Sequence, residues 1–146
     1  MKAFRFPLEK VLGWRHLQMR AEEDKLAVLQ EQMEALNRRA NALATAELNA
    51  KQNVLNSPEV QGSDLHALTA FQDRLNKERI VLAAEKAQCE RRITVQRARL
   101  LKAQRDYRVL EKLRERRQDA WTYSYNREIE NAAADAHLSK LIRGES

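Results

Sequence analysis

The feature that most constrains this chain is one apolar line along residues 65–121, a stretch without proline or glycine. Positions on the line recur in alternating steps of four and three, and most of them are apolar. They are Leu68, Gln72, Leu75, Arg79, Leu82, Lys86, Cys89, Ile93, Gln96, Leu100, Ala103, Tyr107 and Leu110. A mean step of about 3.5 residues predicts one long helix with a coiled-coil seam. Because a lone helix cannot bury such a stripe, a second helix or another protein has to cover it.

The first part of the chain carries a second line of the same kind, and eleven of its fourteen positions are apolar. They are Leu8, Leu12, Arg15, Met19, Glu22, Leu26, Leu29, Met33, Leu36, Ala40, Leu43, Glu47, Ala50 and Val54. Pro7 fits the first turn of a helix, where its missing N–H loses no hydrogen bond. We therefore expect a first helix over about residues 7–56.

The one clear break between the two lines is the stretch Asn56–Asp64, which gathers Pro, Gly, Ser and Asn. These residues favour turns, and Ser63 or Asp64 can cap a following helix. We expect a loop over about residues 57–63 and a second helix over about residues 64–141. The predicted fold class is all-α: a long antiparallel two-helix coiled-coil hairpin, a single domain over residues 1–146, with the second helix longer than the first.

The unequal lengths of the two helices leave one end of the second helix uncovered. Folding about residue 60 places Leu8 near Lys112, so residues after about Leu113 extend past the start of the first helix. Trp121 and other large residues lie in that part of the sequence without an expected partner in the chain.

Composition favours long helices over a globule with a thick core. Charged residues make up 33% of the chain and aromatic residues 5%, with only three Gly and two Pro. No apolar run approaches the ~18 residues that a membrane span needs, and we expect a cytosolic protein.

The single cysteine, Cys89, excludes an internal disulfide. It lies on the seam, where we expect it as a small buried apolar residue.

Positive charge is concentrated in one segment of the second helix. Residues 91–117 hold eleven basic and three acidic residues, a net charge of +8 in a chain of net charge +6. Such an excess attracts acidic partners. The basic partner surface is expected at Arg97, Arg99, Arg105 and Arg108.

A basic nucleic-acid-binding coiled coil is the alternative. Against it, the basic residues lie all round the helix and only Tyr107 is interleaved with them, so we expect no nucleic acid.

The sequence holds no pattern of catalytic or metal-binding residues. His16, His66 and His137 are far apart, and none has a ligand spacing with another His, Cys or carboxylate. A glycine-rich phosphate loop and a Cys-x-x-Cys pair are also missing from the sequence. A two-helix structure offers no deep pocket for a small-molecule substrate. We therefore expect a protein that is not an enzyme and that uses no metal and no cofactor.

Three stretches carry a family likeness. The first is the N-terminal pattern formed by Phe4, Phe6, Leu8, Glu9, Val11, Leu12 and Arg15. The second is the basic run Leu110–Arg117, and the third is the apolar pair Phe71 and Leu75 just after the loop. Together they resemble the FliJ family, small coiled-coil stalk proteins of the bacterial flagellar type III export apparatus. The likeness covers nearly the whole chain in length and architecture.

The resemblance implies a fold similar to the γ stalk of rotary ATPases. It also implies that both helix termini insert into the hexameric ring of the flagellar export ATPase. The region nearer the loop would contact the cytoplasmic domain of the export gate, and the protein would escort export chaperones. The implied location is cytoplasmic, peripheral to the inner face of the cell membrane at the flagellar base.

Two groups of residues are the candidate contacts under this resemblance. The ring contacts are expected at Phe4, Phe6, Leu8, Leu12, Leu110, Leu113, Arg114, Arg117 and Trp121. The gate contacts are expected at Phe71 and Leu75. A competing interpretation of the first group is a structural end cap, in which the two Phe residues fold back onto Trp121. For the whole chain, a stalk of a virulence-type secretion system and a coiled coil that dimerises through its uncovered end are the alternatives.

Overall fold

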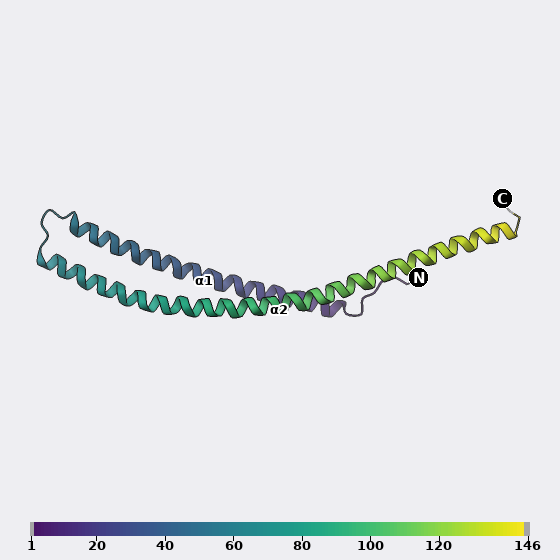
Figure 1. Ribbon diagram of the computed structural model, residues 1–146, viewed down its shortest axis with the longest axis horizontal. Coiled ribbons are helices and arrows are strands. Elements are labelled where there is room, and N and C mark those ends of the chain that lie inside the picture. Colours follow the sequence, from purple (N-terminus) through teal and green to yellow (C-terminus); the bar gives the residue numbers. More distant parts are fainter. Residues whose placement is uncertain (1, 145–146) are drawn as a thin grey trace. The chain divides into compact units, whose positions relative to one another are not determined.

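The computed structural model describes residues 2–144 and contains two helices, α1 (Glu9–Leu55) and α2 (Gly62–Ile142) (Figure 1). The helices pack against each other, and α2 has 81 residues against 47 in α1. Across residues 2–144 the chain forms no strand. The predicted all-α hairpin with a longer second helix is confirmed.

Local hydrogen bonds explain where the helices begin and end. α1 was expected from about residue 7 and starts at Glu9, because Pro7 and Leu8 form a turn in which the Glu9 N–H donates to Phe6 O at 3.1 Å. Before α2, the Gln61 N–H donates to the Asp64 carboxylate at 3.1 Å, which satisfies a donor at the helix start. α2 ends at Ile142, and Gly144 adopts a left-handed φ of 73°, a conformation typical of helix C-termini.

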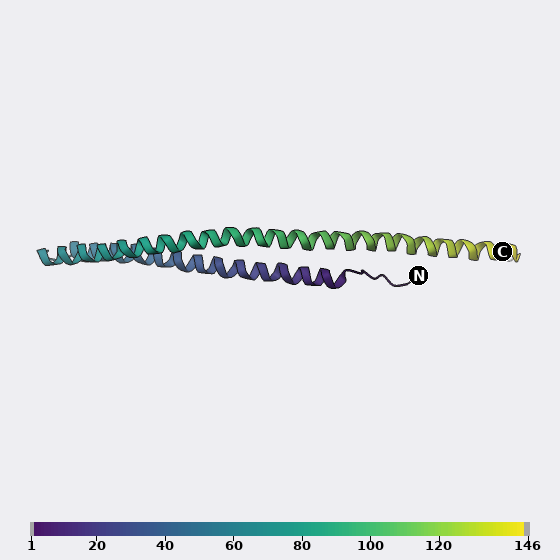
Figure 2. The ribbon, with the colours of Figure 1, turned by 90° about the horizontal axis from the view of Figure 1, so that it is seen from below.

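The chain divides into two compact units, and each contains a piece of both helices. We call Ala21–Leu101 the central unit and the described residues of 2–20 and 102–144 the terminal unit. Figure 2 shows the helices from a second side. None of the described helices has a stretch long and apolar enough to cross a membrane.

In the central unit the two helices run antiparallel: the residue numbers of the contact partners fall along α1 as they rise along α2. The cross-helix pairs are Glu47 with Arg79, Arg39 with Glu85 at 3.3 Å, Leu29 O with Cys89 Sγ at 3.6 Å, and Glu22 with Gln96. The seam buries Leu75, Leu82, Cys89, Ile93 and Gln96 of α2. Cys89 therefore has the buried place that its position on the apolar line predicts.

The predicted apolar lines coincide with the least exposed positions. Every position of both lines, in either unit, is buried or half-buried. In α1 none of them is buried, whereas α2 buries five.

The terminal unit continues the antiparallel pairing. The Arg15 guanidinium donates to Asp106 at 3.3 Å, and the Arg114 guanidinium donates to Glu9 at 2.9 Å. These pairs match the expected register, in which Leu8 lies near Lys112. From Thr122 to Gly144 every residue is exposed, as expected for a helix end that the first helix does not reach.

Candidate functional site

The N-terminal segment of the terminal unit, residues 2–8, lies against α2 around Trp121. The Trp121 indole N–H donates to Lys2 O at 3.0 Å. The rings of Phe4 and Trp121 are tilted by 58° with centroids 6.2 Å apart, and the ring of Tyr125 stacks on that of Trp121 with centroids 5.1 Å apart. Phe6 is 6% exposed. The apolar side chains of this segment are thus used to hold it on the helix.

Two arginines of α2 complete what we call the terminal cluster, defined as Phe4, Phe6, Arg114, Arg117 and Trp121. The guanidinium of Arg114 lies 5.6 Å from the centre of the Phe4 ring, and that of Arg117 lies 5.8 Å from the Phe6 ring. Such cation–π contacts favour arginine over aromatic faces. The N-terminal segment is therefore fixed by one hydrogen bond, by ring contacts and by two cations.

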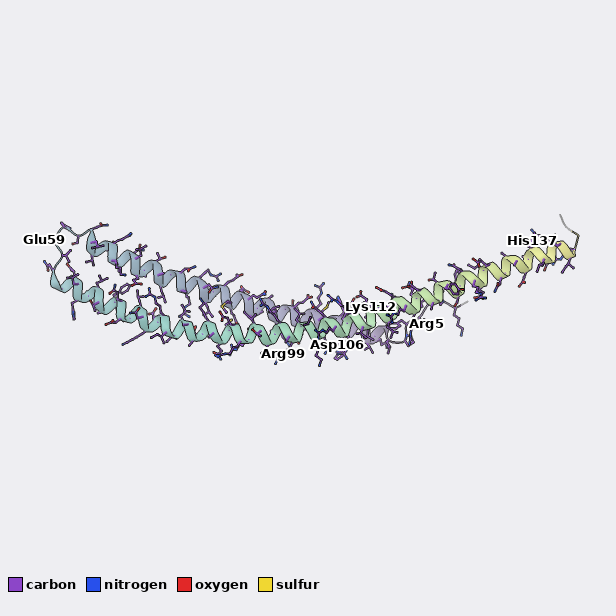
Figure 3. All side chains as sticks on the ribbon, viewed as in Figure 1. Arg5, Glu59, Arg99, Asp106, Lys112 and His137 are labelled. Carbon is purple, nitrogen blue, oxygen red and sulfur yellow. The ribbon has the colours of Figure 1, made fainter. Side chains whose placement is uncertain are left out.

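A hollow opens beside the terminal cluster. It is lined by Lys2, Ala3, Phe4, Arg5, Arg117 and Trp121. Three of these residues are cations and none is acidic. Figure 3 shows Arg5 beside α2 just beyond Lys112, on the same part of the terminal unit. Aromatic walls with cations at their edge suit a partner that brings carboxylates and an apolar side chain.

The structure brings all nine predicted ring-contact residues into the terminal unit, in two different settings. Leu8, Leu12, Leu110 and Leu113 are half-buried, and three of them lie on the seam lines between the helices. The five residues of the terminal cluster gather around the N-terminal segment. Of the end-cap arrangement the structure contains one half: the Phe4 ring contacts Trp121, whereas Phe6 lies against Arg117.

Three residues of this site were not expected from the sequence: Lys2, Arg5 and Tyr125. A helical spacing of four between Trp121 and Tyr125 was a usable signal, because residues four apart lie on one face of a helix. Lys2 and Arg5 had no comparable signal, since only the path of the N-terminal segment places them beside α2.

The predicted gate contacts do not form an open patch on the central unit. Leu75 is 4% exposed and belongs to the seam. Phe71 is half-buried, with the guanidinium of Arg74 at 5.7 Å from its ring, and it lines a hollow with Ala50 and Val54. Phe71 is therefore the more accessible of the two.

The predicted basic surface residues are all exposed but are divided between the units. Arg97 and Arg99 belong to the central unit, and Arg105 and Arg108 belong to the terminal unit. Of the first pair, Arg99 lines a groove beside the seam and Arg97 does not.

Tyr107 of the terminal unit contacts both His16 and Glu111. His16 lies against the Tyr107 ring at 5.2 Å, and a hydrogen bond with Glu111 raises the pKa of the Tyr107 phenol. Within residues 2–144, no group of three or more His, Cys, Asp and Glu could hold a metal ion.

Comparison with known proteins adds one finding. The family model described as "Flagellar FliJ protein" matches residues 4–144, which is almost the whole chain. Neither a curated protein nor a solved structure matches it. The match includes the N-terminal segment, both helices and the uncovered end of α2. The chain therefore belongs to the FliJ family and is a coiled-coil protein of the flagellar export apparatus.

Proposed function

We propose that this chain is a stalk-like regulator of the flagellar export ATPase, inserted into the ATPase ring through its terminal unit. It would supply no chemistry of its own. It would also link the ring to the cytoplasmic domain of the export gate and escort export chaperones. Its place would be cytoplasmic, peripheral to the inner membrane face at the flagellar base.

One observation carries the ring contact: the terminal cluster lies next to a helix end without a packed partner. Beyond Trp121, α2 presents Tyr123 at 67% exposure, Ile129 at 50% and Leu138 at 54%. Large apolar side chains left bare in a protein of this composition favour an interface. Trp and Arg, the residue types of the cluster, are enriched among residues that dominate binding energy.

A stalk in a ring acts by biasing its subunits. If the terminal unit binds one arrangement of the ring more tightly than the others, it lowers the free energy of that arrangement. The effect on ATP hydrolysis is then a coupling free energy, set by the difference in affinity. The cations of the terminal cluster would attract acidic groups of neighbouring ring subunits. When those acidic groups move, the affinity of the cluster for the ring changes, and this change is the required difference in affinity.

The test is ATP hydrolysis by the purified export ATPase with and without the chain. Trp121→Ala and Arg117→Glu should abolish stimulation while circular dichroism shows nearly unchanged helix content. Arg38→Glu, an exposed change in the central unit, is the control and should stimulate as the original chain does.

Two outcomes would contradict the proposal. Unchanged stimulation by both terminal variants would remove the ring contact from this end of the molecule. If Trp121→Ala lowers the melting temperature but stimulation per folded molecule stays intact, the cluster is only an end cap.

The proposed gate contact is tested separately, through Phe71. Phe71→Ala should weaken binding to the purified cytoplasmic domain of the gate and leave ATPase stimulation unchanged. Leu75 is buried in the seam, so Leu75→Ala should instead reduce stability. Equal gate binding by Phe71→Ala would exclude this residue from the contact.

A further inference from the structure

A groove runs beside the seam of the central unit and is not filled by the helix pair. Two adjoining hollows form it, and they share Gln88 and Arg92. Together they extend along α2 from Glu85 to Arg99, with Arg39 on the α1 side. The groove lies entirely within the central unit and is separate from the terminal cluster.

The floor and walls of the groove suit an apolar surface. Leu29 and Leu36 of α1 form part of its lining at the seam. Gln32 and Ala35 stand on the α1 side, and Val95 on the α2 side is 51% exposed. In two-stranded coiled coils the positions that flank the seam usually carry charges that pair across it. Here Arg39 and Glu85 form one such pair, while the neutral residues Gln32, Ala35 and Val95 leave room beside it for a third helix.

The charge of the groove is one-sided. Its lining contains the cations Arg39, Arg91, Arg92 and Arg99 and a single acid, Glu85. That acid is already engaged, because Arg39 donates to it at 3.3 Å. Among the residues that the structure describes, Arg91 and Arg92 make no ion pair. The groove therefore offers apolar contact flanked by Arg91 and Arg92, which have no ion-pair partner among the described residues.

We propose that this groove binds an acidic amphipathic helix of a partner protein. The path from Glu85 to Arg99 corresponds to about 21 Å, or about four helical turns, at 1.5 Å per residue. A partner helix of about 15 residues fills that length. Its apolar residues at steps of three and four would meet Leu29, Leu36 and Val95, and carboxylates on its flank would meet Arg92 and Arg99.

Other occupants fit the groove less well. A nucleic-acid backbone would use the cations but would gain nothing from the apolar lining. A second copy of this chain would have to bring an acidic stripe of its own to the groove. The experiment must therefore distinguish binding of a partner helix from self-association of the chain. The proposal does not depend on insertion into the ATPase ring, because no groove residue belongs to the terminal cluster.

The probe is a fluorescent synthetic helix of about 15 residues, with Leu and Ala on one face and Glu on its flanks. A matched peptide carries Lys in place of Glu. Anisotropy with the full chain should show saturable binding of the acidic peptide only. Arg92→Glu should weaken this binding at least about tenfold, and Val95→Asn about threefold. Arg38→Glu changes the net charge equally outside the groove and should alter binding by less than about twofold.

Several results would overturn the proposal. Absence of saturable binding, equal binding of the Lys peptide, or equal weakening by Arg38→Glu and Arg92→Glu would each do so. Release of the acidic peptide by a short DNA duplex that itself binds the original chain but not Arg92→Glu would assign the groove to nucleic acid. Sedimentation showing a dimer of the original chain and a monomer of Arg92→Glu would assign it to a second copy.

If Arg92→Glu loses peptide binding but stimulates the ATPase normally, the groove and the terminal cluster act separately.

Discussion

The central unit and the terminal unit use the same long helix in different ways. In the central unit α2 buries Leu75 to 4% and Leu82 to 3% exposure against α1. In the described part of the terminal unit the only buried side chain is Phe6, which comes from outside the helices. The first region is held by a buried seam. The second combines a half-buried seam and two cross-helix ion pairs with ring contacts, cations and one indole hydrogen bond. The difference shows that the most deeply buried positions and the aromatic, cation-rich surface lie on different lengths of one helix.

Both units pair polar residues across the seam. The three polar positions on the α1 line are Arg15, Glu22 and Glu47, and each meets a polar group of α2. Their partners are Asp106, Gln96 and Arg79. A polar residue on a coiled-coil seam costs stability but selects the register in which it finds its partner. We infer that these pairs fix the register within each unit.

The largest expected effect breaks the seam of the central unit. Leu82→Ala should lower the free energy of unfolding by about 2–4 kcal/mol, because it leaves a cavity at a position that is almost fully buried. Urea denaturation followed by circular dichroism measures this loss. Leu101→Ala, at a position that is 45% exposed, is the matched control and should cost less than about 1 kcal/mol. Equal losses would mean that the seam does not carry the stability.

The next effect removes a buried polar partner. Gln96 is 4% exposed and donates both to Glu22 O at 3.1 Å and to the Glu22 carboxylate. Gln96→Leu should cost about 1–2 kcal/mol, because the acceptors on Glu22 lose their donor. The double variant Glu22→Leu/Gln96→Leu should recover the stability. If the single variant is as stable as the original, the hydrogen bonds contribute nothing net.

A smaller effect concerns the terminal unit. Trp121→Phe keeps a ring beside Phe4 but removes the N–H that bonds Lys2 O. The N-terminal segment should loosen by about 1 kcal/mol, the usual value of one hydrogen bond. Trypsin should then cleave after Arg5 faster, while global unfolding stays unchanged. Trp14→Phe, at a position that is 53% exposed, is the control and should leave cleavage unchanged.

The smallest effect is a pH dependence confined to the central unit. Hydrogen bonds from Gln96 and Arg79 lower the pKa of Glu22 and Glu47 below the ordinary value of 4.5. Each carboxylate therefore stabilises the fold above about pH 4.5, and this contribution is lost as the pH falls through the lower folded pKa. The urea midpoint should fall between pH 6 and pH 3, and less so in Glu22→Gln/Glu47→Gln. An equal fall in both proteins would show that other groups cause it.

The two helices and the seam could be predicted from the spacing of apolar residues alone. Alternating steps of four and three identified every seam position, because a coiled coil requires that period and little else satisfies it. Folding about residue 60 placed Leu8 near Lys112, and the observed pair of Glu9 with Arg114 lies within one helical turn of that register. Family membership was also readable, since the N-terminal pattern lies within the stretch matched by the family model.

Only the tertiary structure decided which side chains are available to a partner. Phe6 and Leu75 were expected as contacts, and packing buries both. Lys2 and Arg5 reach the terminal cluster only because the N-terminal segment, which has no helical period to read, extends along α2 past the start of α1. The groove beside Arg92 likewise depends on how the flanks of two helices face each other. A helical period fixes which face of a helix is covered, but the neighbouring surface decides what stays open.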